Sequence, residues 1–164
     1  MSADIKTTHT FHASRELVFK ALTDAEHVKN WWGPKGWIFE VSKADFSPGG
    51  IFLYSQKPVD GEPMWVKFVY KELLAPEKIV YSSFFSDEAG NPVRAPFDAH
   101  YPLEILNTMT LTEVAGKTTL TMMVTPVSPT EEEWRAFEAT KEMAQGGYKG
   151  TFVQLDEYLE KMEA

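Results

Sequence analysis

The chain has 164 residues, which fits one domain spanning residues 1–164, and it carries 24 acidic and 16 basic side chains but no cysteine. The net charge of −8 opposes binding to nucleic acid or anionic lipid, because phosphate groups would be repelled. The lack of cysteine excludes disulfides, thiolate nucleophiles and cysteine metal sites. There is no secretory signal and no apolar run of the roughly 20 residues that a membrane span needs, so we expect a cytoplasmic protein.

The beginning of the chain predicts one strand followed by two short helices. Residues 5–12 are rich in threonine, with apolar residues between them, which indicates an edge-like first strand. Ser14 is a suitable N-cap for a first helix whose apolar side chains fall on one face. A second short helix, capped by one of residues 23–24, is expected to run to about Asn30 and to end at the glycines and proline of residues 33–36.

The middle of the chain predicts about six antiparallel strands. They are expected at residues 37–46, 51–56, 64–74, 79–85, 103–113 and 118–125. Alternation is clear in the third of these, where Phe68 and Tyr70 share one face while Lys67 and Lys71 share the other. Such alternation is typical of a sheet with one buried face.

One long helix is expected to close the chain. Ser128, Pro129 and Glu131 match the N-cap, N1 and N3 positions of a capping box. From residue 130 to about 161, large apolar side chains fall on one side of the helical wheel. The plan is therefore α+β, with a curved antiparallel sheet of about six to seven strands covered by this helix.

The same sequence predicts a cavity between the helix and the sheet. Around residues 140–145 the inner side of the helix becomes small or polar, while the facing strands still offer aromatic side chains, which is typical of a small-molecule pocket. Asn107 interrupts an apolar face, so its amide must find a partner in backbone, water or ligand. The candidate ligand-binding residues are Trp32, Phe52, Tyr54, Phe68, Tyr70, Asn107, Met109, Met122 and Tyr148.

Residues 86–102 form an unusually long connection between strands, with three prolines. We interpret this loop as a candidate gate at the cavity entrance, in which Phe97 and His100 take part. Arg94, its only firm positive charge, is the candidate partner for an anionic group on a ligand. The alternative is a surface loop without function.

No catalytic or metal-binding motif is present, and the catalytic residues, if any, stay unassigned. His9 and His12 point to opposite faces of a strand, so they cannot share a metal ion there. His27 is expected to be solvated beside Glu26 on a short helix. Neither a metal nor a cofactor is therefore expected.

Together, several segments resemble the activator of heat-shock protein 90 ATPase homologue-like family, a branch of the START-like (SRPBCC) superfamily that includes polyketide cyclases and aromatases. The segments are residues 15–24, 31–34, 48–50, 70–73, 76–80, 118–121, 146–148 and 155–159. The resemblance implies a helix-grip fold, in which the sheet wraps the C-terminal helix around a deep cavity. Phe68 stands where family members often have glycine, so the cavity is expected to be partly filled.

Three functions remain open. The first is binding of a hydrophobic or aromatic small molecule by a monomer or homodimer, which needs a cavity without converging acid and base groups. The second is an enzyme of the cyclase, aromatase or hydrolase type, which needs such groups in one volume. The third is a chaperone-cofactor-like interaction module, which needs a filled cavity and an exposed apolar patch.

Overall fold

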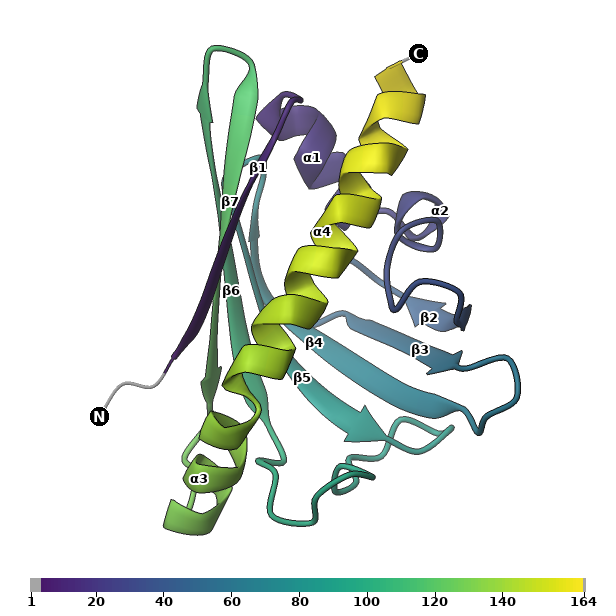
Figure 1. Ribbon diagram of the computed structural model, residues 1–164. Helices are drawn as coiled ribbons and strands as arrows, with labels where there is room; N and C mark the ends of the chain where they lie inside the picture. The colour runs from purple at the N-terminus through teal and green to yellow at the C-terminus, as the bar shows by residue number, and fades with distance from the viewer. Residues whose placement is uncertain (1–3, 164) are drawn as a thin grey trace.

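Seven strands form one antiparallel sheet, and the last helix lies diagonally across it (Figure 1). The structure is a computed structural model that describes residues 4–163. Its elements are β1 (Ile5–Phe11), α1 (Arg15–Leu22), α2 (Ala25–Val28), β2 (Ile38–Ala44), β3 (Ile51–Lys57), β4 (Met64–Leu74), β5 (Lys78–Ser86), β6 (Ile105–Val114), β7 (Lys117–Pro126), α3 (Glu131–Ala139) and α4 (Lys141–Glu163). Within these residues, no helix is long and apolar enough to cross a lipid bilayer.

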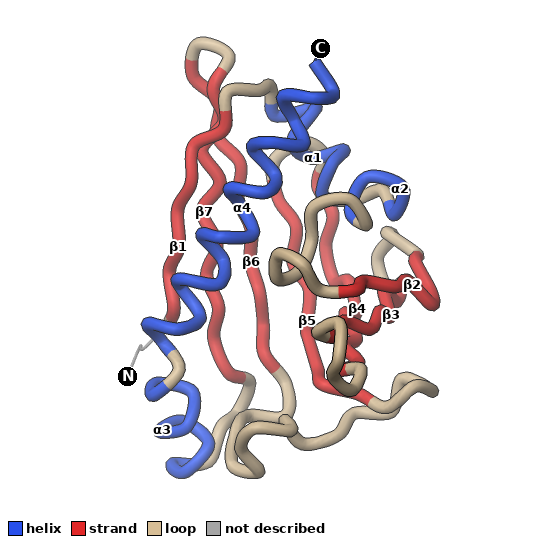
Figure 2. The backbone as a smooth tube through the Cα atoms, turned by 45° about the vertical axis from the view of Figure 1, so that its right-hand side comes forward, coloured by secondary structure: helices blue, strands red, loops and turns tan. Residues whose placement is uncertain are grey.

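The strand order is β1-β7-β6-β5-β4-β3-β2, so the first strand lies at one edge and the second at the other. The predicted α+β fold and its antiparallel strands are confirmed, with shifts of one or two residues at strand ends. The two largest shifts, of two residues each, are at the end of β2, which is Ala44 rather than residue 46, and at the start of β6, which is Ile105 rather than residue 103. Figure 2 shows that α4 crosses one face of the sheet, with α1 and α2 beside its C-terminal half.

Two capped short helices follow β1, as predicted. The Ser14 side chain accepts a hydrogen bond from the backbone N–H of Leu17, and the Asp24 side chain accepts one from that of Glu26. The second helix is shorter than expected and ends at Val28. Trp31 then anchors both helices, because its buried indole Nε1 donates to the carbonyl of Ala21 at 3.1 Å.

The predicted single terminal helix is two helices, α3 and α4, which are separated by Thr140. Thr140 breaks the regular pattern because both its backbone N–H and its hydroxyl donate to the carbonyl of Phe137. The capping box is also two residues later than expected. Thr130 is the N-cap and Glu133 the N3 residue, whereas Ser128 has a left-handed φ of 44°. The glycines of residues 146–150 leave α4 continuous.

The C-terminal half of α4 packs on β1 of the sheet, where the rings of Phe152 and Phe11 meet edge to face with centroids 6.0 Å apart. Phe152, Leu155 and Leu159 are buried there, as the apolar stripe on the helical wheel predicts. They share one hydrophobic cluster with Phe11 and Leu120 from the facing strands. The N-terminal half of α4 behaves differently, because small side chains replace the large ones and the space beneath is not filled.

Candidate ligand-binding cavity

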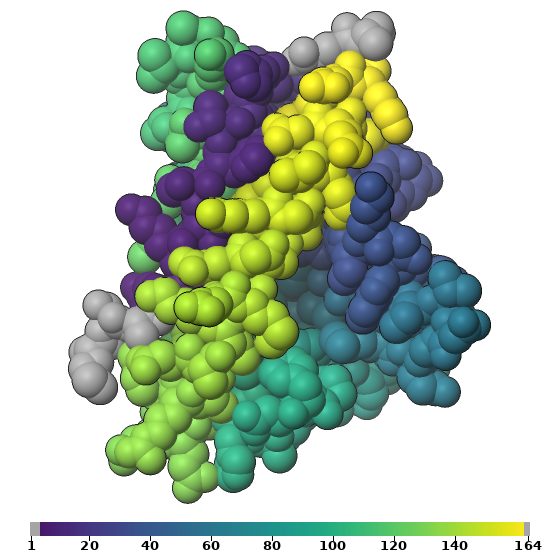
Figure 3. All heavy atoms as spheres, in the orientation of Figure 1, coloured from purple at the N-terminus to yellow at the C-terminus, as the bar shows by residue number. Residues whose placement is uncertain are grey.

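A cavity of about 360 Å³ lies between the N-terminal half of α4 and the far ends of β3, β4 and β5. In the space-filling view, the surface is hollowed between α4 and the segments that precede β2 and β6 (Figure 3). The cavity is lined by Trp32, Gly33, Pro34, Tyr54, Gln56, Met64, Val66, Phe68, Tyr81, Ser83, Phe84, Phe85, Tyr101, Pro102, Leu103, Asn107, Ala144, Gly147, Tyr148 and Thr151. This volume is large enough for a small aromatic molecule.

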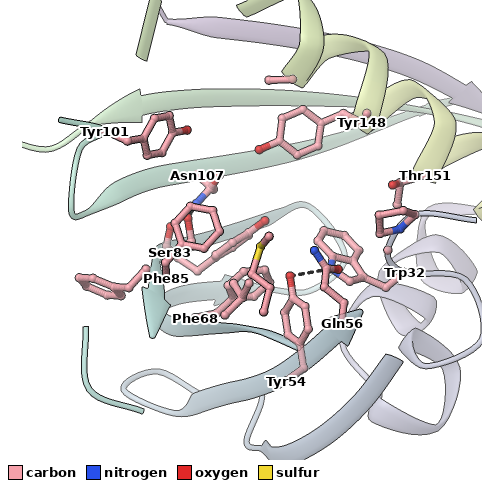
Figure 4. Close-up of a pocket in the computed structure, with 18 of the residues that line it drawn as sticks. Trp32, Tyr54, Gln56, Phe68, Ser83, Phe85, Tyr101, Asn107, Tyr148 and Thr151 are labelled. Carbon is pink, nitrogen blue, oxygen red and sulfur yellow. Dashed lines mark hydrogen bonds between the residues drawn. The ribbon is translucent and has the colours of Figure 1, made fainter. Parts of the chain in front are cut away.

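The segment that leads from α2 to β2 forms one wall, and α4 holds it in place. The side-chain amide of Gln154 donates to the carbonyls of Trp31 and Gly33 at 3.2 and 2.6 Å. Gly33 has a φ of +92°, and a Cβ there would approach the Oε1 atom of Gln56 to 3.2 Å, so glycine suits the position. The backbone path thereby turns the ring of Trp32 into the cavity, where its Nε1 donates to the hydroxyl of Tyr54 at 2.9 Å (Figure 4).

Helix α4 forms the opposite wall with small side chains and one large ring. Ala144, Gly147 and Thr151 face the cavity along one side of the helix, and a Cβ at Gly147 would meet nothing within 4 Å. Tyr148 extends from the same helix toward Asn107 and Tyr101 (Figure 4). The helix therefore leaves space under its first half and places a single phenol in that space.

The side-chain NH2 group of Asn107 on β6 is hydrogen-bonded within the protein. Its Nδ2 donates to the hydroxyl of Ser83 at 3.0 Å, and more weakly to the carbonyls of Ile105 and Tyr81 at 3.3 and 3.4 Å. The hydrogen bonds to backbone carbonyls, which were one of the options expected for this amide, are therefore present. Asn107 nevertheless borders the cavity, so these bonds also hold its side chain in one orientation.

Among residues 4–163, no Asp, Glu, His, Lys or Arg lines the cavity, and the polar groups of the lining are mostly phenols and amides. Burial raises the pKa of Tyr54 above its ordinary value of 10.0, although the hydrogen bond from Trp32 opposes the shift. Burial also raises the pKa of Tyr81 and of Tyr148, and neighbouring phenols raise both further. The three hydroxyls therefore stay protonated at neutral pH and act as hydrogen-bond donors or acceptors.

Comparison with known proteins agrees with this architecture. The family model described as activator of Hsp90 ATPase homolog 1-like protein matches residues 12–160. The chain belongs to this family. No curated protein sequence matches it significantly.

Solved structures share the helix-grip fold of the family. A protein from Staphylococcus epidermidis is 25% identical with a TM-score of 0.79, and the match covers 99% of this chain and 92% of that one. Protein Ms6760 from Mycobacterium smegmatis is 23% identical with a TM-score of 0.76, over 94% and 88% of the two chains. The AHSA1 protein of Silicibacter pomeroyi is 17% identical with a TM-score of 0.69, over 99% and 100%.

In this member of the family, five of the nine candidate ligand-binding residues border the main cavity. They are Trp32, Tyr54, Phe68, Asn107 and Tyr148. Three others, Phe52, Tyr70 and Met109, border a second cavity of about 20 Å³ that lies closer to α1 and α2. Met122 borders neither of these cavities and is buried in the core, with 1% of its surface exposed.

Phe68 explains this division. Its ring, together with those of Trp32 and Tyr81, borders both cavities. The Phe68 ring packs on Tyr81 with ring centroids 4.4 Å apart and edge-on against Trp32 at 5.9 Å. Residues behind this aromatic group, such as Phe52, share the inner face of the sheet but are screened from the larger space.

The candidate gate is held against α3. Between β5 and β6, residues 87–104 form a segment, called the flap here, whose last part borders the cavity through Tyr101, Pro102 and Leu103. The Arg94 guanidinium donates to Glu133 of α3 at 2.6 Å and to the carbonyl of Tyr101 at 3.2 Å. Arg94 does not border the cavity, so the structure does not support its expected contact with an anionic ligand.

The other two gate residues lie on the outside of the flap. Phe97 is 53% exposed and packs on Phe85 and Tyr101, with ring centroids 5.6 and 5.1 Å away. His100 is exposed and pairs with Glu132 of α3 at 3.1 Å. The contact between Tyr101 and Phe137 continues this aromatic group into α3.

Sequence reasoning missed several lining residues. Tyr81, Ser83 and Phe85 alternate along β5 and face inward together, so the period of two within residues 79–85 could have identified them. Gln56 and Met64 follow the same rule on β3 and β4. Residues 101–103 carry no such signal, because the flap is irregular and only its packing on β5 and α3 brings them to the cavity.

The histidines lie elsewhere. His9 on β1 is hydrogen-bonded to Asp156 of α4 at 2.6 Å, while His12 is exposed. His27 was expected to be solvated, but it is half-buried, and its Nδ1 and the hydroxyl of Tyr158 are hydrogen-bonded at 2.6 Å. None of the three borders the main cavity, so they fasten elements together or face solvent.

Proposed function

We propose that this family member is a single-domain cytoplasmic protein that binds a hydrophobic or aromatic small molecule in the main cavity, as a monomer or homodimer and without a cofactor. The observation that carries the proposal is the lining, in which aromatic and apolar side chains surround a few neutral polar groups. Trp32, Tyr54, Phe68, Asn107 and Tyr148 are the proposed contact residues from the sequence, and Tyr81 joins them.

The lining favours binding over catalysis. Acid–base chemistry in this volume would require two titratable groups that differ in pKa and converge on one ligand. The residues that border the cavity include only phenols as titratable groups, and burial keeps these protonated. The open volume also argues against a pure interaction module, for which a filled core was expected.

Ligand entry is proposed to involve the flap. Its contacts with α3, which include the Arg94–Glu133 and Tyr101–Phe137 pairs, hold Tyr101 and Leu103 at the cavity border. Release of these contacts would widen the cavity at the α3 end without disturbing the sheet. In this proposal Arg94 acts on the flap and not on the ligand.

Adjacent glycines on α4 provide a matched test of binding. Gly147 borders the cavity and Gly146 does not, and a Cβ at either position meets nothing within 4 Å. Gly147→Phe should therefore place a ring in the cavity or over its rim, whereas Gly146→Phe should add one outside it. With the fluorescent neutral probe N-phenyl-1-naphthylamine, we expect about tenfold weaker binding to Gly147→Phe and unchanged binding to Gly146→Phe. Equal affinities for all three proteins would refute the site.

A second measurement asks whether the natural ligand is retained. Native mass spectrometry of protein purified from its own cells should show a mass increase that disappears on denaturation. The increase should be reduced in Gly147→Phe and present in Gly146→Phe. A bound mass that both variants retain would place the ligand elsewhere.

A further inference from the structure

Two tyrosine hydroxyls reach the main cavity without a protein partner. Tyr81 projects from β5 and Tyr148 from α4, so they approach from opposite walls. Among the described residues, the only enclosed side-chain polar atoms that lack a hydrogen bond are Oγ1 of Thr7 and Nε of Arg15. The hydroxyl oxygens of Tyr81 and Tyr148 are not among these enclosed atoms, and no hydrogen bond joins them to another group within residues 4–163. Both hydroxyls are therefore open to the cavity.

A third phenol is partly used. The Tyr54 hydroxyl accepts from Nε1 of Trp32, which leaves its own hydrogen free to donate. Tyr54, Tyr81 and Tyr148 line the same cavity and come from three different elements, β3, β5 and α4. The cavity thus holds several neutral O–H donors near one another in an otherwise apolar space.

The surroundings disfavour a charged ligand. A carboxylate that enters the cavity loses its hydration, and no lysine, arginine or histidine of the described part of the chain borders the space to compensate for that loss. Arg94, on the nearby flap, is already paired with Glu133. A cation would find aromatic faces, yet none of the described residues that border the space is a carboxylate that could neutralise its charge.

We infer that the ligand is uncharged and carries a hydrogen-bond acceptor, such as a ketone or quinone carbonyl, which binds to the hydroxyls of Tyr81 and Tyr148. This inference rests on the proposed function and specifies its ligand class. Buried donors are satisfied by such an acceptor, and the aromatic rings around them cover the apolar remainder of the molecule. A purely hydrocarbon ligand would instead exclude water from both hydroxyls and leave them without partners.

Four probes of nearly equal size test the inference by equilibrium dialysis at pH 7. They are 2-acetylnaphthalene, 2-isopropenylnaphthalene, 2-naphthoate and 2-(trimethylammonio)naphthalene, which differ in acceptor and charge. In the wild type, we expect both ions to bind at least about tenfold more weakly than the ketone. Tyr81→Phe and Tyr148→Phe should each weaken ketone binding about three- to tenfold and alkene binding less than twofold, because only one hydrogen bond is removed.

Tyr158→Phe is the matched control, because Tyr158 is on α4 but bonds to His27 away from the cavity. It should leave the affinities of all four probes unchanged. Binding of either ion as tightly as the ketone would overturn the inference, and so would equal losses of ketone and alkene in the two cavity variants. If none of the four probes binds, the proposed function fails together with the inference.

Discussion

The indole of Trp32 and the phenol of Tyr54 are joined by a hydrogen bond of 2.9 Å across the border of the main cavity (Figure 4). Trp32 follows the two short helices and Tyr54 lies on β3, so this bond fastens the segment before β2 to the sheet. It also leaves the Tyr54 hydroxyl with a fixed direction for its hydrogen. This one hydrogen bond therefore holds the cavity wall together and orients a hydroxyl donor beside the cavity.

Trp32→Phe is expected to lower the free energy of unfolding by roughly 1–3 kcal/mol, because it removes this hydrogen bond and part of the ring packing. Urea denaturation followed by circular dichroism measures the change. Trp37→Phe is the control, since Trp37 is exposed and its replacement should change stability by less than about 0.5 kcal/mol. Equal effects of the two substitutions would show that the bond contributes nothing.

Phe68→Leu is expected to join the two cavities, because the Phe68 ring borders both. The substitution should lower stability by about 1–2 kcal/mol. It should also raise the affinity for 2-acetylanthracene relative to 2-acetylnaphthalene, since the longer ring system gains space. Phe52→Leu is the matched control, because Phe52 is paired with Phe68 on the neighbouring strand and borders only the small cavity. If Phe68→Leu leaves the ratio of the affinities for the two probes unchanged, the Phe68 ring does not separate the two cavities.

The pairing of the flap with α3 should weaken in acid. The hydrogen bond from Arg94, and then that from the backbone of Thr130, hold the pKa of Glu133 below its ordinary value of 4.5. A lowered pKa in the folded state stabilises the protein above the unfolded value, and this contribution disappears as the pH falls through the folded value. Arg94→Ala should therefore lower the free energy of unfolding by less than about 1 kcal/mol at pH 7 and by a smaller amount at pH 3.

Denaturation of the wild type and of Arg94→Ala at both pH values gives this difference. Arg135→Ala is the comparison, because it removes an exposed pair with Glu131 on the same helix, which is worth at most about 0.5 kcal/mol. Hydrogen exchange of residues 87–104 should increase in Arg94→Ala and not in Arg135→Ala. The same loss of stability from Arg94→Ala at both pH values would contradict an electrostatic role.

The start of α3 gives a further test. Thr130→Ala should lower stability by about 1 kcal/mol, because the Thr130 hydroxyl accepts from the backbone N–H of Glu133. Ser128→Ala should cost less, since Ser128 is not the cap. Ser128→Gly should be neutral or stabilising, because the left-handed φ of 44° favours glycine. Thermal denaturation measures these changes in stability. A larger loss of stability from Ser128→Ala than from Thr130→Ala would show that Ser128 is the N-cap, as the sequence predicts.

The sheet could be predicted from the sequence because its pattern is local. Alternation along residues such as Phe68 and Tyr70 follows from the burial of one face, and Thr118 to Val124 show it again in β7. The break at Thr140 could not be predicted in this way. It depends on two hydrogen bonds to one carbonyl, which threonine forms only where packing permits them.

Only part of the cavity could be predicted, for a related reason. Asn107 can be identified because it interrupts an apolar inward face, and Tyr54 and Tyr148 because they are large aromatic residues on the facing strand and on the helix stripe. Met122 has the same inward orientation on β7 but is buried in the core and borders neither cavity. The period of a strand identifies the face of a residue, while its place along the helix decides whether it reaches a cavity.

The uneven filling beneath α4 divides the molecule into two halves with different tasks. One half, around Phe152 and Leu155, is closed and holds the fold together, whereas the other, around Gly147 and Tyr148, is open. Substitutions in the open half touch few of the contacts on which the closed half depends. A protein built in this way can change what it recognises over evolutionary time, by exchanging residues along one end of a helix and three strands, while its architecture is inherited intact.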